Sequence, residues 1–302
     1  MLSFPYRAPT VPDSVDPPRR PSKIGSNFET EWARSPAARW ARALVVEGPM
    51  RLMVRVAASP ERNGLDRLED LRSSGASTPV IFAANHHSHL DTPLLITSIP
   101  EPWRHRLVVG AAADYFFTSR ITGTLSALTL NAFPVDRTVV SRKSTDLAGG
   151  LLTDGWSLLI YPEGGRSPDG WSQPFHRGTA YLARKADVPV VPIHLEGTGQ
   201  IFGKGMTQPR PGRTLVTFGA PLWIGAEEST GRFNDRIEAA VQELADEASS
   251  DWWTARRNAA RGQTPSLSGP QAGGWRRAWR LTEDRRRGKT SRVAPTRQWP
   301  KL

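Results

Sequence analysis

Short apolar segments that alternate with helix-like segments set the strongest limit on the fold of this chain. Apolar runs recur at residues 79–84, 106–112, 128–135, 157–161, 188–194 and 214–218. Between them, the sequence predicts helices from Asp114 onward, over residues 141–152 and over residues 178–186. Strands that are apolar on both faces are typical of sheets covered by helices on both sides. We therefore predict an α/β fold with a mainly parallel or mixed sheet flanked by helices.

Amphipathic segments lie on either side of this alternation. Residues 28–58 carry Trp, Leu, Val and Met side chains among five arginines, which predicts one or two amphipathic helices with a break near Gly48 and Pro49. An apolar repeat at helical spacing predicts the last regular helix at Phe233, Ile237, Val241 and Leu244. The periodicity is not expected to continue beyond Ser250.

The basic character of the chain is confined to its C-terminal end. The net charge is +11, yet residues 1–251 hold 27 basic and 27 acidic residues. Residues 252–302 hold thirteen basic residues, two acidic residues and five Trp. Because basic residues are attracted to anionic headgroups and Trp prefers the membrane interface, this tail is expected to contact an anionic membrane surface. A solvated flexible tail is the alternative, and no nucleic-acid partner is expected because the rest of the chain is neutral.

The sequence also limits the location of the chain and the chemistry open to it. The absence of Cys excludes a disulfide framework, a Cys-ligated metal and a thiol nucleophile. The Pro-rich residues 1–25 lack the apolar core of a secretory signal and are expected to be disordered. The best candidate span, residues 41–58, is interrupted by charged residues, so no transmembrane helix is expected. We therefore expect a peripheral protein on the cytoplasmic side of the cell membrane.

The densest cluster of reactive side chains follows the first predicted strand. Asn85-His86-His87-Ser88-His89-Leu90-Asp91 holds three of the six His residues of the chain. Open α/β sheets place their sites beyond the carboxyl ends of the strands. In one interpretation, Asp91 accepts the Nδ1 proton of His86 and orients this residue as a general base. The nucleophile would then be a hydroxyl group of the substrate.

A metal site is the alternative interpretation of the same residues. His87, His89 and Asp91 have the spacing of metal ligands in one class of metallohydrolase. That pattern normally continues with a His directly after the Asp, where this chain has Thr92. The alternative predicts bound zinc or manganese.

Further polar clusters stand at the ends of other predicted strands. Tyr161-Pro162-Glu163-Gly164-Gly165-Arg166-Ser167 offers a tight glycine turn, a hydroxyl group and a guanidinium suited to phosphate or carboxylate. Arg137 follows another strand and would reach the same anion. His176-Arg177-Gly178 begins the next helix, whose N-terminus adds a positive dipole. The sequence thus predicts an anion site beside a general base.

Four blocks together resemble the glycerolipid acyltransferase family, which includes the 1-acylglycerol-3-phosphate acyltransferases. The H-x4-D block of the family resembles Asn85 through Asp91, and its G-x-F-x-x-R-like block resembles Asn131 through Arg137. Its F-P-E-G-T-R-S block resembles Tyr161 through Ser167, and V-P-[IV] resembles Val191-Pro192-Ile193. The resemblance covers roughly residues 30–250. Asn131, Tyr161 and Gly165 replace the usual Gly, Phe and Thr.

This resemblance implies an activity and a set of site residues. His86, oriented by Asp91, would deprotonate the free hydroxyl of 1-acyl-sn-glycerol 3-phosphate. That hydroxyl would attack the thioester of acyl-CoA or acyl-carrier protein and give phosphatidate, without a metal or cofactor. The residues implied in acceptor binding are Arg137, Glu163, Gly164, Gly165, Arg166 and Ser167. Another acceptor, such as glycerol 3-phosphate, another lysolipid or a polar lipid, is the alternative within the family.

The resemblance also suggests how the chain is organised. Residues 26–250 would form the acyltransferase domain, with an amphipathic helical region over residues 26–75. Residues 1–25 would precede it as a disordered Pro-rich segment, and residues 251–302 would follow it as the basic Trp/Arg-rich tail. The expected partners are the lysophospholipid acceptor, the acyl donor and an anionic membrane surface, which the tail and the N-terminal helices would contact.

Overall fold

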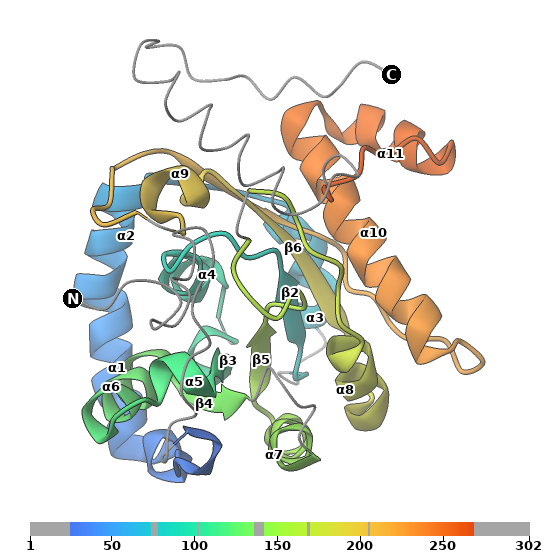
Figure 1. Cartoon of the computed structure of the whole chain (residues 1–302). Coiled ribbons are helices and arrows are strands. Elements are labelled where there is room, and N and C mark those ends of the chain that lie inside the picture. The colour runs from blue at the N-terminus through green and yellow to red at the C-terminus, as the bar shows by residue number, and fades with distance from the viewer. Residues whose placement is uncertain are drawn as a thin grey trace, which may run out of the picture.

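A twisted β-sheet forms the centre of the computed structural model, which describes residues 25–73, 78–101, 103–135, 142–167, 170–204 and 206–268 (Figure 1). Within these residues the sheet has seven strands in the order β1-β7-β6-β2-β5-β3-β4. They are β1 (Pro60–Asn63), β2 (Ile81–Ala84), β3 (Leu107–Ala112), β4 (Ala132–Val135), β5 (Ser157–Ile160), β6 (Val190–Glu196) and β7 (Thr214–Phe218). Neighbouring strands run parallel except β6 and β7. The predicted α/β fold is confirmed.

Helices cover both faces of this sheet. One face is covered by α1 (Pro36–Val45), α2 (Arg51–Ala58) and α4 (Asp91–Ser98), and the other by α7 (Arg142–Thr153), α8 (Gly178–Ala186) and α10 (Thr230–Ser249). Strand β2 serves both layers, because Phe82 and Ala84 point into the first core and Ile81 and Ala83 into the second. A strand buried on both faces is apolar at every position, as the sequence predicted.

The remaining elements are short or lie at the edges of the fold. The shorter helices are α3 (Glu69–Ser73), α5 (Ala113–Phe116), α6 (Arg120–Leu130), α9 (Thr198–Phe202) and α11 (Trp252–Ala260). Single turns of 3-10 helix occur at η1 (Gly25–Asn27), η2 (Glu31–Arg34), η4 (Leu65–Leu68) and η5 (Arg104–Arg106). Helix α5 lies directly beyond the end of β3, and α9 directly beyond the end of β6.

The N-terminal helix runs without interruption through the predicted break. Helix α1 continues through a π-helical turn, η3 (Val46–Met50), directly into α2. Pro49 lies inside that turn. A π-turn is wider than an α-turn and proline has no N–H to pair, so the turn accommodates the residue without ending the helix. The prediction of a break near Gly48 and Pro49 is therefore wrong.

Two further boundaries differ from the prediction. The apolar run 128–135 spans the last turn of α6 and all of β4, since Asn131 adopts a left-handed conformation (φ 52°) that ends the helix. A regular helix also exists beyond Ser250, because the side chain of Asp251 caps the N-terminus of α11 by accepting from the N–H of Thr254. Among the described residues, no helix combines the length and apolar character that crossing a membrane requires.

Candidate active site

The two polar clusters meet at the carboxyl ends of β2 and β5. Asn85 directly follows β2, and its side chain takes the place of a strand backbone. The amide Nδ2 donates to the carbonyl of Leu195 (2.9 Å), and the N–H of Leu195 donates to Oδ1 (2.7 Å). These paired bonds extend the contact between β2 and β6 by one residue. They fix the point from which the loop with His86 departs.

His86 and Asp91 form a hydrogen-bonded pair within this loop. The Nδ1 atom of His86 lies 2.8 Å from Oδ2 of Asp91, which is fully buried at the first residue of α4. The same oxygen accepts the backbone N–H groups of His87 (2.7 Å) and Ser88 (2.8 Å). Burial opposes ionisation of Asp91, but hydrogen bonds and charge from His86 with help from Thr198 and Ser88 hold its pKa below the usual value.

The state of Asp91 determines the role of each His86 nitrogen. An ionised carboxylate only accepts hydrogen bonds, so Nδ1 carries the proton of the neutral ring. The Nε2 atom then has a lone pair and is able to take a proton from a substrate. The pair is geometrically suited to general-base chemistry.

Tyr161 fixes the plane of the His86 ring. The two rings stack with centroids 4.0 Å apart and planes inclined by 16°. The phenol group of Tyr161 is hydrogen-bonded to Oγ1 of Thr92 at 3.0 Å, and burial together with the nearby Asp91 raises its pKa well above the usual value. Tyr161 therefore stays a neutral support for the imidazole across the physiological range.

Glu163 joins the two loops from within. Its Oε1 accepts the N–H of His86 (3.0 Å), and its Oε2 accepts the N–H of Gln173 (3.0 Å). Burial raises the pKa of this carboxyl to about 7, although both backbone bonds favour the ionised form. The N–H of Ser167 in turn donates to the carbonyl of His86 (2.8 Å). Glu163 and Ser167 thus both hold the backbone of His86 in place, and contact of either residue with substrate stays a prediction.

The predicted anion loop turns sharply beside these contacts. Gly164 has φ +70°, and a Cβ there would lie 3.1 Å from Cδ2 of His176. Only glycine therefore fits this turn without strain. Gly165 and Arg166 follow directly, both partly exposed. Arg137 lies outside the described residues, so its place relative to this turn stays a prediction.

The metal interpretation finds a different arrangement of its residues. The Nε2 atom of His89 bonds the hydroxyl of Tyr115 (2.8 Å), and Asp91 Oδ2 faces His86 and two backbone N–H groups. Neither His87 nor His89 belongs to a group of ligand atoms close enough to share an ion in the part of the chain that the structure describes. The geometry therefore favours the His86–Asp91 pair.

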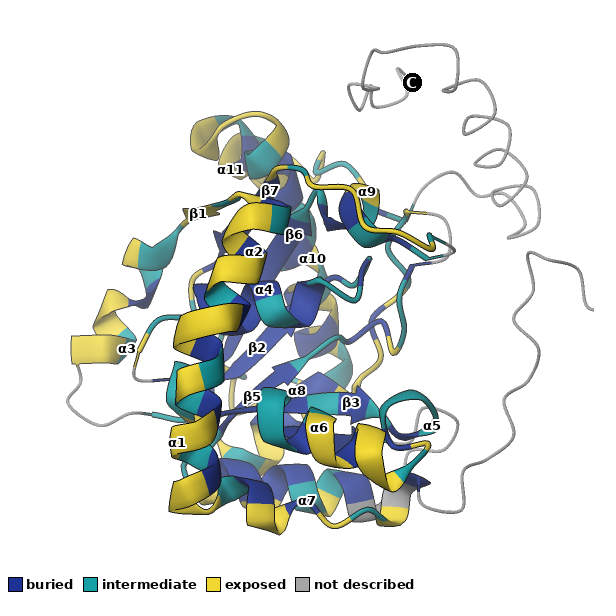
Figure 2. Cartoon of the chain, turned by 90° about the vertical axis from the view of Figure 1, so that its left-hand side faces the viewer, coloured by how far each residue is buried: buried dark blue, intermediate teal, exposed yellow. Residues whose placement is uncertain are grey.

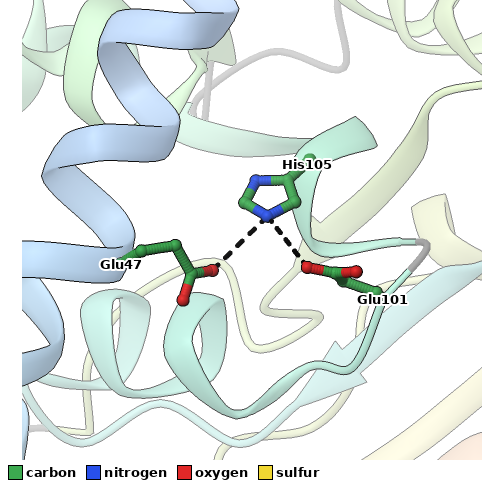
Figure 3. Close-up of side chains that lie close together, drawn as sticks. All are labelled: Glu47, Glu101 and His105. Atoms are coloured by element: carbon green, nitrogen blue, oxygen red, sulfur yellow. Dashed lines mark ion pairs between the residues drawn. The ribbon is translucent and has the colours of Figure 1, made fainter.

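Among the described residues, one other group of ligand-type side chains does lie close enough together to share an ion, elsewhere on the surface. Figure 3 shows Glu47, Glu101 and His105, with the His105 Nε2 atom 3.4 Å and 3.3 Å from the two carboxylates. The carboxylate of Glu47 already pairs with Arg51 and Arg104 at 2.9 Å each. These guanidinium groups would repel a metal ion, so the cluster is a network of ion pairs.

Two residues that the sequence did not single out, Thr198 and Tyr115, contribute to the site. Thr198 begins α9 and is one of the groups that lower the pKa of Asp91. Tyr115 reaches His89 from α5. Ser88, which belongs to the predicted cluster, donates to the carbonyl of Phe202 (2.7 Å). Thr198 and Tyr115 follow different strands, and position just beyond an apolar run is the signal by which they could have been found.

Comparison with known proteins agrees with this geometry. Residues 63–196, which contain both clusters, match the family described as Acyltransferase. This segment belongs to the acyltransferase family. The family recognised from the sequence is thus confirmed.

Named relatives of this acyltransferase segment are distant. The chain is 33% identical over 147 residues to the chloroplastic 1-acyl-sn-glycerol-3-phosphate acyltransferase BAT2 of Brassica napus. The aligned residues cover 48% of this chain and 40% of that protein. It is 32% identical over 129 residues to 1-acyl-sn-glycerol-3-phosphate acyltransferase beta of Homo sapiens, covering 42% of this chain and 44% of that protein. The chain therefore spans about half, or less, of the length of these curated relatives.

A solved structure shares the fold. The crystal structure of the 1-acyl-sn-glycerophosphate acyltransferase PlsC from Thermotoga maritima superposes with a TM-score of 0.56 at 19% identity. The match covers 74% of this chain and 86% of that chain. At this identity the likeness shows a shared fold alone.

Proposed function

We propose that this chain transfers a fatty acyl group from acyl-CoA or acyl-carrier protein to the free hydroxyl of 1-acyl-sn-glycerol 3-phosphate, giving phosphatidate. The observation that carries the proposal is the 2.8 Å contact between His86 Nδ1 and the buried Asp91 carboxylate, within a segment that matches the acyltransferase family. The names of the distant relatives support the choice of acceptor.

The reaction follows from the arrangement of the pair. The Nε2 atom of His86 takes the proton of the acceptor hydroxyl as its oxygen attacks the thioester carbonyl. Collapse of the tetrahedral intermediate forms the ester, breaks the carbon–sulfur bond and releases the thiolate, which receives the proton from His86. Asp91 stabilises the imidazolium between these steps. Catalysis of this kind is typically worth about 10² to 10⁴ in rate.

The acceptor phosphate is proposed to lie over the Gly164–Gly165 turn, held by Arg166 and by Arg137. An arginine fork matches the oxygens of a phosphate in geometry and charge. The contacts from Glu163 and Ser167 to the His86 backbone tie this turn to the general base. Binding of the phosphate and placement of the hydroxyl near Nε2 would thereby be coupled.

A lipid acceptor requires contact with a membrane, and we propose that the N-terminal helix supplies it together with the basic tail. Apolar side chains point outward along α1 and α2 at multiples of four residues, namely Trp40, Leu44, Leu52 and Val56. Figure 2 shows this outer side of both helices as exposed. Helices with an exposed apolar strip and flanking arginines lie in the plane of a membrane surface.

The test is acyl transfer from a long-chain acyl-CoA to 1-acyl-sn-glycerol 3-phosphate in liposomes, with EDTA present. The His86→Ala variant is expected to lose about 10² to 10⁴ in rate. His105→Ala is the matched control, because its ring lies in the ion-pair network of Glu47 and Glu101, and it is expected to retain the wild-type rate.

Other outcomes would redirect or refute the proposal. Unchanged turnover by His86→Ala would refute its role as the general base. Product formed only from glycerol 3-phosphate or from another lysolipid would replace the acceptor and keep the reaction. A wild-type chain that uses none of these acceptors with either type of donor would refute acyl transfer altogether.

A further inference from the structure

Helix α6 exposes an unusually apolar face for a surface helix. Ile121 and Leu125 stand one turn apart and are 73% and 55% exposed. The helix sequence RITGTLSALTL contains no acidic residue, and Arg120 is its one charged residue. Surface helices of globular proteins normally present charged residues to water. The face therefore requires an explanation beyond folding of the domain.

The opposite face of α6 carries the packing that the fold needs. Gly123 and Ala127 are buried, and a Cβ at Gly123 would lie 3.0 Å from the ring of Phe28 and 3.1 Å from that of Phe117. The Ser119 and Thr122 side chains cap the helix at its start. Ile121 and Leu125 take no part in these contacts. Their apolar character is therefore not explained by the stability of the helix.

Arg42 joins α6 rigidly to the N-terminal helix. Its guanidinium is buried and donates to the carbonyls of Ala127 (3.2 Å) and Leu128 (2.9 Å) in α6, and to the carbonyl of Ala33. Trp40 and Leu44, which are 75% and 72% exposed, belong to the same helix as Arg42. Figure 2 shows the exposed sides of α1 and α6 turned toward the same viewer. The two helices thus form one apolar surface with a fixed internal geometry.

The charges around this surface select the partner that fits it. Besides the buried Arg42, residues 36–58 and 117–135 contain four arginines and one carboxylate. That carboxylate, Glu47, is neutralised by Arg51 and Arg104. An apolar surface edged by more exposed cations than acids complements an anionic lipid surface, where each exposed cation adds about 1 kcal/mol of attraction.

The surface also leads toward the proposed active site. Helix α5 directly precedes α6, and its Tyr115 stacks edge-to-face on Phe116 with centroids 4.9 Å apart. Tyr115 in turn stacks on and bonds to His89, three residues after His86. Both aromatic side chains are partly exposed. Aromatic contacts therefore lead from α5, next to α6, to the loop that carries the general base.

We propose that α6 is a second lipid-contacting element, which with α1 and α2 seats the domain on an anionic membrane so that the aromatic residues of α5 face the lipid. The inference rests on the proposed function, because a lipid substrate is the reason for the domain to lie on a membrane. Its physical basis is the fixed surface of α1 and α6. The acyl chains of the donor and of the lysolipid would then reach His86 without crossing water.

The test measures binding of the full chain to vesicles of phosphatidylcholine with phosphatidylglycerol by flotation. The double variant Ile121→Ser with Leu125→Ser is expected to bind about tenfold more weakly or worse, because two aliphatic side chains no longer enter the lipid. The swap Ile121→Leu with Leu125→Ile is expected to bind like the wild type. Tyr181→Ser is the matched control, because Tyr181 is 48% exposed on α8, across the sheet.

A second readout separates this inference from the proposed function. Acyl transfer to a short-chain lysophosphatidate that stays monomeric in solution is expected to be unchanged in the serine double variant. Transfer to vesicle-borne acceptor is expected to fall in parallel with binding. If the wild type shows no acyl transfer, the proposed function fails while the flotation result still decides the role of α6.

Three results would overturn the inference. The first is equal vesicle binding by the wild type and the serine double variant. The second is a wild-type chain that does not bind these vesicles. The third is a change in oligomeric state by light scattering without a change in vesicle binding, which would make the face a protein interface. Thermal denaturation of the variants shows that any loss of binding occurs in a folded chain.

Discussion

Substitution of Glu163 by Gln is expected to change how the stability of the chain depends on pH. The carboxyl lies almost fully buried and has its pKa raised from 4.5 to about 7. Between these values the folded state holds a proton that the unfolded state has released. The free energy of unfolding therefore falls as pH rises through this window. At pH above about 7 the buried carboxylate is ionised, and the full cost of burying its charge lowers the free energy of unfolding.

The size of the effect follows from the same interval. While the two states differ by one proton, each pH unit lowers the free energy of unfolding by about 1.4 kcal/mol. Across the window from 4.5 to about 7 the loss accumulates to about 3 kcal/mol. The side-chain amide in the Glu163→Gln variant would still accept one of the two backbone N–H groups, and the lost bond would cost about 1 kcal/mol at every pH. Only the ionisable residue therefore produces a slope.

Urea denaturation followed by Trp fluorescence measures this directly. The free energy of unfolding of the wild type minus that of Glu163→Gln is plotted from pH 4 to pH 8.5, so that the other titrating groups cancel. The difference is expected to fall by about 3 kcal/mol between pH 4.5 and pH 8. A flat difference, or one that rises with pH, would refute the conclusion that burial outweighs the hydrogen bonds to His86 and Gln173.

Three other substitutions test contacts of the site and the fold. Asp91→Asn should keep the chain folded but lower kcat by about 10² to 10⁴, measured by initial rates of acyl transfer, and near-normal turnover would contradict the pair with His86. Asn85→Leu should lower the free energy of unfolding by about 2–4 kcal/mol in urea, because the N–H and carbonyl of Leu195 lose their partners, whereas a change below about 1 kcal/mol would show that these groups find others. Arg42→Met should cost about 2–4 kcal/mol in thermal or chemical denaturation, since three carbonyls lose a charged donor, and an unchanged midpoint would argue against the link to α6.

The strands were predictable because β2, β5 and β6 are buried on both faces and therefore apolar throughout most of their length. The apolar pattern did not predict strands whose side chains are polar and exposed. Strand β1 (Pro60–Asn63) is polar and lies at the edge of the sheet, so pairing with β7 alone defines it. Strand β7 runs antiparallel to β6 because of the path that the connection takes after α9, and composition does not encode that path.

In the candidate active site, contacts between residues close in sequence were predictable, and contacts between distant segments were not. His86 and Asp91 lie on one short loop, so their spacing in the sequence already limited the distance between them. The partners of Glu163 are backbone N–H groups of His86 and Gln173, and the type of residue at a position says little about where its N–H points. Tyr115 lies on α5, directly beyond the end of β3. Only the order of strands in the sheet brings it close to His89.

The N-terminal helix has a practical consequence for handling the protein. Val46, Met50, Val54 and Ala58 are part of the core against the sheet, and Arg42 completes the end of α6. The helix therefore cannot be cut away like a detachable anchor to obtain a chain that is easier to purify. A shortened chain that starts at β1 would expose the sheet to water and is expected to aggregate. Polar substitutions at outward positions such as Trp40 and Leu44 would instead make the surface of the helix more polar while keeping the core closed.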